Sequence, residues 1–171
     1  DTELSGLGGK PGGERFLQPS VTVRYRVYGR EMTVRNNWVE AGFAMLNGAP
    51  TFLTLADRAA RPHDVRIELP AAWKTSSTPL LPVAGQPHSY RADTFDTLVD
   101  SPIILGNSVT RTFTVAGKAH HLVLEGDPSL FDADRAAADV QKIVEAATAA
   151  MGTFDYPHYF FLNMVVETGG G

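Results

Sequence analysis

The segment from Asp132 to Met151 constrains the fold more than any other part of the sequence. Its apolar residues recur at the spacing of one helix face, and they are Val140, Ile143, Val144, Ala147 and Met151. Charged residues occupy the other faces, which is typical of an amphipathic helix with one side against a core. Asp132 is placed to cap the first turn, and Gly152 suits the left-handed position after the last turn. The sequence therefore predicts a helix over residues 132–151.

A strand-like run follows the predicted helix, from Tyr159 to Val166. The run is mostly apolar and does not alternate with polar residues. Such a pattern is typical of a strand that is buried on both faces. We therefore predict a strand over residues 159–166, with neighbours packed against both of its sides.

Residues 21–28 alternate between apolar and polar side chains, as a half-buried strand does. The apolar face would consist of Val21, Val23, Tyr25 and Val27. We expect a second strand after a turn at Gly29, running through Met32 and Val34.

Two further segments, 64–69 and 108–115, show the same alternation. Pro70 ends the first of them, because proline cannot donate to a strand ladder. A turn at 116–118 leads from the second segment into a strand at 121–124. Short antiparallel strands joined by turns predict a sandwich or a curved sheet. The predicted fold class is thus α+β, a β-rich, sandwich-like domain followed by one long helix and a strand.

The change from short strands to a long helix places a module boundary near residues 126–131. We divide the chain into a flexible arm rich in glycine and proline at 1–20, a β-rich and incomplete domain at 21–128, and the start of a second domain at 129–171.

Composition excludes several classes of partner. A formal net charge of -4 and a pI near 5.7 leave no basic stripe for phosphates, so we expect no nucleic acid partner. No apolar run reaches the ~20 residues that span a bilayer, so we expect no membrane partner. The chain has no cysteine, which rules out disulfides and thiolate metal sites within it. The compartment stays open between the cytoplasm and export.

The histidines give no complete metal site. No two of the five histidines lie at the i, i+4 spacing of a helical ligand pair. The nearest approach to a cluster is His120 and His121 with Glu125. Adjacent residues of a strand point to opposite faces, so we expect one inward, hydrogen-bonded histidine and one solvated histidine rather than a metal site.

Other candidate residues have structural explanations that we favour. His158 is expected in a loop, and Trp73 in a packing role. Tyr156 and Tyr159 are expected to wedge the helix against a sheet, the alternative being a substrate pocket. A set of three carboxylates is expected to form caps and turns rather than an acid/base pair, and it comprises Asp93, Asp96 and Asp100. No serine lies in a Gly-x-Ser-x-Gly nucleophile elbow.

Four segments in a fixed order carry a resemblance to a known family. They are residues 25–28, 69–73, 100–106 and 152–160. Together they resemble the glycyl aminopeptidase family, bacterial zinc peptidases that often carry a PDZ domain. The resemblance runs from about Val21 to the last residue. It implies that the helix and strand near the end begin a thermolysin-like catalytic domain.

The resemblance also gives a role to the final glycines. In the family, a glycine pair after this strand opens a Gly-Gly-x-Glu-His segment, and an H-E-x-x-H zinc helix and a further glutamate follow. This sequence contains the glycines and none of the later elements. The resemblance implies that main-chain atoms of Gly169, Gly170 and Gly171 bind the peptide substrate along an edge formed by residues 164–171. On residues alone, a flexible glycine tail at a chain end is the favoured explanation.

The functional hypothesis is therefore part of a zinc-dependent aminopeptidase that removes small N-terminal residues, glycine or alanine, from peptides. The zinc ligands would lie outside this chain, so the 171 residues alone are expected to be inactive. The expected partners are the peptide substrate and the remaining catalytic domain. The alternative is a non-catalytic β-sandwich module for protein interaction, because no complete catalytic set is present.

Overall fold

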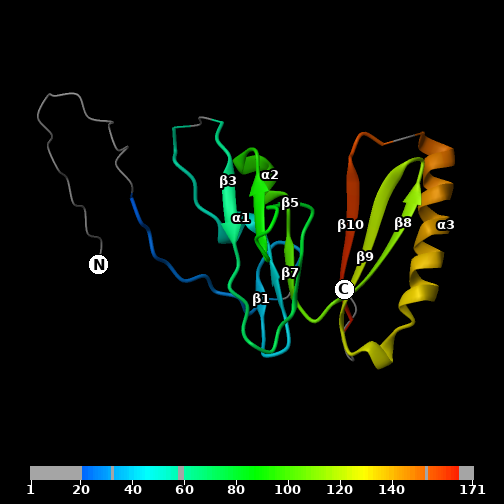
Figure 1. The fold of residues 1–171 in the computed structure, drawn as a ribbon, viewed down its shortest axis with the longest axis horizontal. Coiled ribbons are helices and arrows are strands. Elements are labelled where there is room, and N and C mark those ends of the chain that lie inside the picture. The colour runs from blue at the N-terminus through cyan, green and yellow to red at the C-terminus, as the bar shows by residue number, and fades with distance from the viewer. Residues whose placement is uncertain (1–20, 32, 58–59, 153, 166–171) are drawn as a thin grey trace, which may run out of the picture.

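The computed structural model describes residues 21–31, 33–57, 60–152 and 154–165. Its elements form two groups, a β body and an α/β unit, which lie side by side and are joined by the segment between β7 and β8 (Figure 1). This α+β arrangement, mostly sheet with one main helix, confirms the predicted fold class.

Two small antiparallel sheets make the β body. The first has the order β1-β2-β7-β4, comprising β1 (Trp38–Val39), β2 (Ala44–Leu46), β7 (Ile103–Gly106) and β4 (Thr75–Ser77). The second has the order β3-β6-β5, comprising β3 (His63–Arg66), β6 (Ser89–Ala92) and β5 (Leu81–Pro82). Two short helices accompany the sheets, α1 (Gly48–Thr51) and α2 (Phe95–Val99).

The two sheets share a core, as in a sandwich. One buried cluster contains Ile103 of β7, and another contains Leu98 of α2. Phe52 and Val65 pack against both clusters and so connect them. Burial of apolar side chains between two short sheets is what holds such sheets together, because neither has enough strands to be stable alone.

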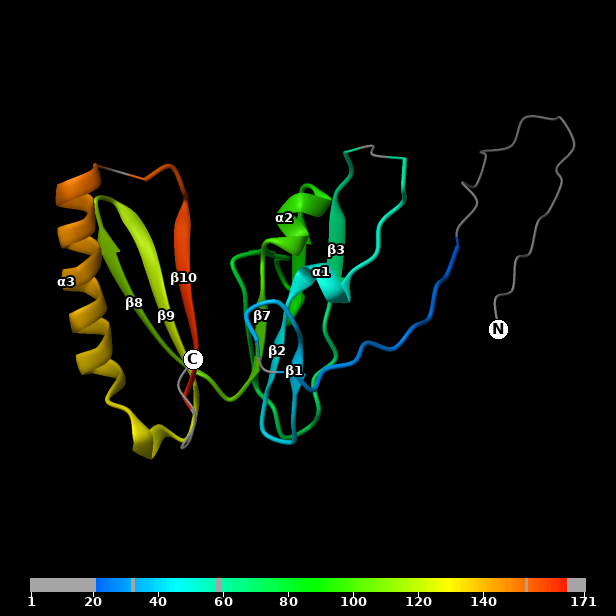
Figure 2. The ribbon, with the colours of Figure 1, turned by 180° about the vertical axis from the view of Figure 1, so that it is seen from behind.

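The α/β unit is a three-stranded sheet covered by one helix. A hairpin of β8 (Val109–Val115) and β9 (Lys118–Gly126) leads through the 3-10 turn η1 (Pro128–Leu130) into α3 (Ala133–Met151). The chain then returns as β10 (His158–Val165), which pairs with β9 in parallel, so the sheet order is β10-β9-β8. Figure 2 shows α3 lying along the face of this sheet that points away from the β body.

The helix forms where the sequence predicted it. The Asp132 carboxylate accepts from the backbone N–H groups of Asp134 and Arg135, and Gly152 ends the helix at a φ of 85°. Val144 packs into the core between helix and sheet. Ile143 and Met151, which were assigned to the apolar face, are 67% and 75% exposed. The spacing thus predicted the helix correctly, but the buried face of the helix is narrower than predicted.

The predicted strands at the start of the described chain are absent. Residues 21–28 are extended but belong to no sheet, because no strand of the described residues lies beside them to complete a ladder. The expected second strand is also wrong: Val34 is 91% exposed, and pairing begins only at Trp38. Met32 and the predicted arm at 1–20 lie outside the described residues.

Two further predictions differ from the structure. β10 is not buried on both faces: none of its residues is fully buried, because the strand lies at the edge of its sheet. The predicted module boundary at 126–131 does not coincide with the division between sheets. β8 and β9 pair with β10 and not with strands of the β body. The break between sheets therefore falls between Gly106 and Val109. Among the described residues, no helix combines the length and apolar character that crossing a membrane requires.

The cap of α3 gives a first prediction. Asp132→Ala removes the acceptor for two backbone N–H groups, so we expect the free energy of unfolding to fall by about 1 kcal/mol. Urea denaturation followed by circular dichroism measures this change. The control is Asp139→Ala, which removes an exposed carboxylate that pairs with Lys142 in the middle of the same helix. Exposed pairs contribute little, so equal losses in the two variants would contradict the capping role.

The contact between β9 and β10 gives a second prediction. Gly126 has a φ of 138°, and a Cβ added there would lie 2.2 Å from the Val165 carbonyl oxygen. Gly117, in the β8–β9 turn, also has a positive φ, but a Cβ there would meet nothing within 4 Å. We expect Gly126→Ala to lower the free energy of unfolding by at least about 1 kcal/mol more than Gly117→Ala. Thermal denaturation of both variants measures the difference, and an equal loss would mean that the close approach is not required.

Candidate functional site at the carboxyl ends of β9 and β10

The parallel pairing brings two strand ends to one place. The register runs from His158 opposite Ala119 to Val165 opposite Gly126, so both strands reach their carboxyl ends together. The predicted substrate-binding residues Gly169, Gly170 and Gly171 come after this point and lie outside the described residues. Their contact with a substrate stays a prediction, and the structure fixes only the strand that leads to them.

β10 has an unpaired side. It is the first strand in the order β10-β9-β8, and no strand among residues 21–31, 33–57, 60–152 and 154–165 pairs with its outer edge. A free strand edge presents N–H and C=O groups that an extended peptide can bind by main-chain hydrogen bonds. The geometry of Met164 and Val165 therefore suits the peptide-binding edge that the sequence resemblance implied.

Glu125 holds the end of β9 against the β body. The residue is 4% exposed, and its carboxylate accepts from the Asn107 backbone N–H at 3.2 Å and from the Ser108 hydroxyl at 2.6 Å. A Cβ at Gly106 would lie 2.6 Å from this carboxylate. Only glycine therefore fits at position 106, where the backbone runs next to the carboxylate. The Ser108 N–H in turn donates to Thr75 Oγ1 at 2.9 Å. This network joins β9 to the linker and to β4.

His120 is the inward, hydrogen-bonded histidine that the sequence predicted. It is 1% exposed, and its ring stacks on Phe113 with centroids 5.2 Å apart. Nδ1 lies 3.0 Å from the Lys118 carbonyl, which can only accept, so Nδ1 carries the proton. In the neutral ring Nε2 then accepts from the Tyr156 hydroxyl at 2.8 Å. Both ring nitrogens are used within the fold.

His121 points to the opposite face and is only half-buried. Its Nδ1 lies 2.9 Å from Thr112 Oγ1, and its ring lies 4.4 Å from that of Phe160. The predicted solvated histidine is therefore only partly exposed to solvent. Burial lowers the pKa of His121, and the nearby His158 and His120 lower it further.

His158 begins β10 rather than lying in a loop, because its backbone pairs with Ala119. Its Nε2 donates to the Pro79 carbonyl at 2.9 Å, which ties β10 to the β body. His158 is therefore not a loop residue but a link between the two groups of elements.

The described residues do not fit a zinc site. His120 and Glu125 lie on opposite faces of β9, and each is bound to other partners. Within the described ranges, no three histidine, aspartate or glutamate side chains gather closely enough to hold a metal ion. No catalytic step through zinc can be assigned to these residues.

Aromatic residues at the start of β10 have structural contacts. Tyr156 meets His120 edge to face and lies 5.4 Å from the Tyr159 ring. Trp73 packs against the core of the first sheet and donates from Nε1 to the Ala41 carbonyl at 3.1 Å. The packing role predicted for Trp73 is confirmed.

Two of the three aspartates near α2 lie at the ends of this short helix. The N-cap of α2 is Thr94, whose hydroxyl accepts from the Thr97 N–H, and Asp100 occupies the C-cap. Asp96 lies in the first turn, where a carboxylate is favourable. The expected caps and turns are confirmed for these two aspartates.

One polar network escaped the sequence analysis. Ser76 Oγ lies 2.7 Å from His88 Nδ1 and 2.5 Å from the Tyr90 hydroxyl. Ser76 belongs to the first sheet and Tyr90 to the second, so the network links the two sheets. The partners lie 12 and 14 residues apart in the sequence, and no local motif marks them.

The lowered pKa of His121 predicts a pH dependence of folding. The unfolded chain takes up the proton at the ordinary imidazole pKa of about 6.5, whereas the folded chain takes it up at a lower pH. The free energy of unfolding should therefore decrease as the pH falls below about 6.5. The decrease is complete once the pH lies below the pKa of His121 in the folded chain. When the pH is lowered from about 7.5 to 5, we expect the free energy of unfolding to fall less in the His121→Gln variant than in the parent chain. Urea midpoints at both pH values measure this, and identical losses would contradict it.

Comparisons of this chain with family models and with solved structures show which protein family it belongs to. The model of the Peptidase M61 N-terminal domain matches residues 16–107, more than half of the chain. A crystal structure of an aminopeptidase N family protein from Idiomarina loihiensis is similar, with a TM-score of 0.75 and 29% identity. The match covers 84% of this chain and 25% of that protein, so the chain spans about a quarter of its length. No curated protein matches the chain.

The structural match extends past the family model. Because 84% of the chain is more than residues 1–107, it includes part of the α/β unit as well as the β body. The family model and the structural match thus agree with each other and with the four sequence segments. The chain belongs to the M61 peptidase family, the glycyl aminopeptidases, and carries its N-terminal domain.

Proposed function

We propose that the chain is part of a zinc-dependent aminopeptidase that removes small N-terminal residues, glycine or alanine, from peptides. The family match and the similarity to an aminopeptidase N family protein support a peptidase. The observation that carries the proposal is the outer edge of β10, which has no partner strand in the described residues and which ends at Val165, shortly before Gly169 in the sequence.

The proposed role of this chain is to bind and orient the peptide. Main-chain groups along β10 pair with an extended substrate, and the following glycines let the two backbones approach closely because they have no Cβ. His158 fixes β10 by its bond to the Pro79 carbonyl, and Glu125 fixes the neighbouring strand β9 by its bonds to the linker. The zinc ligands lie outside residues 1–171, and the remaining catalytic domain is the partner that supplies them.

An activity assay tests the proposal. The polypeptide that contains this chain at its natural length is assayed with the p-nitroanilides of glycine, alanine and leucine, alongside the 171-residue chain. We expect the natural polypeptide to favour glycine and alanine over leucine by at least about tenfold, the discrimination that a small pocket provides. A chelator should abolish turnover and added zinc should restore it, while the 171-residue chain should show none.

Two results would overturn the proposal. Turnover by the 171-residue chain with one bound zinc would place the ligands inside it. A natural polypeptide without peptidase activity would instead favour the non-catalytic β-sandwich interaction module, the alternative that the exposed apolar residues of 21–28 support.

A further inference from the structure

Asn47 occupies a position where an asparagine is chemically unstable. The chain has five asparagines, and Asn47 is the one that glycine follows. The backbone nitrogen after an asparagine can attack the side-chain carbonyl carbon, and glycine allows this approach best because it has no Cβ. The pair Asn47-Gly48 is therefore the place in this chain where an asparagine loses its amide group most readily.

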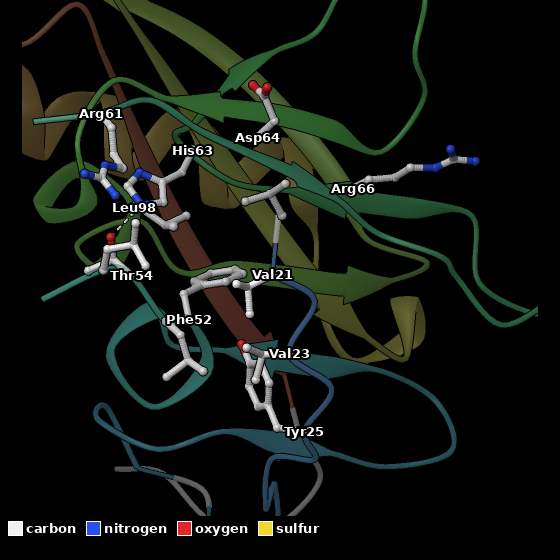
Figure 3. A pocket seen from close by; sticks show the side chains of 13 residues that line it. Val21, Val23, Tyr25, Phe52, Thr54, Arg61, His63, Asp64, Arg66 and Leu98 are labelled. Carbon is white, nitrogen blue, oxygen red and sulfur yellow. Dashed lines mark hydrogen bonds between the residues drawn. The ribbon is translucent and has the colours of Figure 1, made fainter. Parts of the chain in front are cut away.

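The packing of α1 requires this glycine. Gly48 begins α1 and is buried against α2, where an added Cβ would lie 2.5 Å from the Val99 Cα and 2.6 Å from the Leu98 carbonyl oxygen. Figure 3 shows the surroundings of this contact, where Phe52, which directly follows α1, and Leu98 of α2 line the same groove. Any other residue at position 48 would push the two helices apart, so the fold retains a reactive asparagine–glycine pair.

A cluster of polar residues holds Asn47 in place. We call Asn36, Asn37, Asn47 and Thr51 the asparagine cluster. The Asn47 Nδ2 group donates to the Asn36 carbonyl, and the Asn47 backbone N–H donates to Asn37 Oδ1 at 2.7 Å. The Asn37 Nδ2 group donates to Thr51 Oγ1 at 2.8 Å, and the Thr51 hydroxyl donates to the Asn47 carbonyl at 2.5 Å. Both the side chain and the backbone of Asn47 are thus fixed by its neighbours.

The asparagine cluster controls whether the reaction can begin. The attack joins the Asn47 side chain to the Gly48 nitrogen in a ring and releases the amide group, so Nδ2 must give up its bond to the Asn36 carbonyl. Residues 33–35, next to Asn36, are exposed, and Asn36 lies outside the strands of the first sheet. Such a segment opens locally at a free energy below that of global unfolding. The rate of the reaction should therefore follow the opening of the cluster.

We propose that Asn47 is a modification site at which this chain deamidates without an enzyme, at a rate set by the asparagine cluster. The Gly48 nitrogen forms a bond to Asn47 Cγ, its proton passes to the leaving amide group, the Cγ–Nδ2 bond breaks and ammonia departs. Water then opens the resulting cyclic imide and leaves aspartate or isoaspartate at position 47. This inference is independent of the proposed peptidase activity.

The product of this reaction no longer fits its surroundings. An aspartate carboxylate can only accept hydrogen bonds, and so can the Asn36 carbonyl that faces it. An isoaspartate also adds a carbon to the backbone where α1 begins. Thr51 of the cluster anchors a further segment, since its carbonyl accepts from the Tyr25 hydroxyl at 2.6 Å. Deamidation should therefore loosen α1 and residues 21–28 together.

The rate is tested on the 171-residue chain by incubation at mildly alkaline pH, with peptide mapping by mass spectrometry to follow Asn47. We expect Asn47 to deamidate at least about tenfold more slowly in the folded chain than in urea, because the cluster must open first. Thr51→Val removes one member of the cluster and should speed the reaction at Asn47 but not at Asn107, which lies in the linker. The control Thr54→Val, at a hydroxyl that pairs with His63 outside the cluster, should leave both rates unchanged.

The consequence for stability is tested with Asn47→Asp. Loss of the bond to Asn36 should lower the midpoint of thermal unfolding by about 2–4 °C or more. The control Gln86→Glu makes the same chemical change at an exposed side chain and should leave the midpoint unchanged. Equal rates at Asn47 in the folded and the unfolded chain, an unchanged rate in Thr51→Val, or equal midpoints for Asn47→Asp and Gln86→Glu would overturn the proposal.

Discussion

The parallel pairing of β9 with β10 is the constraint on which the α/β unit depends. Two parallel neighbours cannot be joined by a tight turn, so the chain must cross over the sheet, and α3 provides the crossover. The crossover fixes which face of the sheet is covered, because the apolar stripe around Val144 must meet Phe113 and Val115. The close approach of Gly126 to Val165 then brings the two strands together where both end.

Polar contacts join this unit to the β body. Glu125 binds the linker through Asn107 and Ser108, and His158 binds the Pro79 carbonyl. Loss of these donors would be costly, because the buried carboxylate oxygens would be left without compensating hydrogen bonds. The same contacts therefore set the direction of β10, the strand that leads toward the proposed substrate site.

Local patterns in the sequence predicted individual helices and strands well, but they did not predict which strands pair with one another. The spacing from Asp132 to Met151 and the alternation through 108–115 identified α3 and β8, because periodicity depends on side chains of the same segment. The edge position of β10 was missed, since an apolar run does not report how many strands lie beside it. The grouping of β8 and β9 with β10 was missed for the same reason.

At the candidate site, too, the sequence predicted the orientation of a side chain but not its distant partners. The inward His120 followed from strand alternation, but its partner Tyr156 is 36 residues away and could not be inferred from spacing. The donors to Glu125 come from 17 and 18 residues earlier, across a sheet boundary that the sequence placed elsewhere. Family resemblance supplied what local patterns lacked, because the order of four segments reflects the whole domain.

The most direct test of the account is the intact mass of the natural polypeptide together with its zinc content, measured on one sample. The account predicts a mass well above the 18.5 kDa of this chain and about one zinc per polypeptide, as a catalytic site of this type requires. A mass near 18.5 kDa without zinc would contradict it.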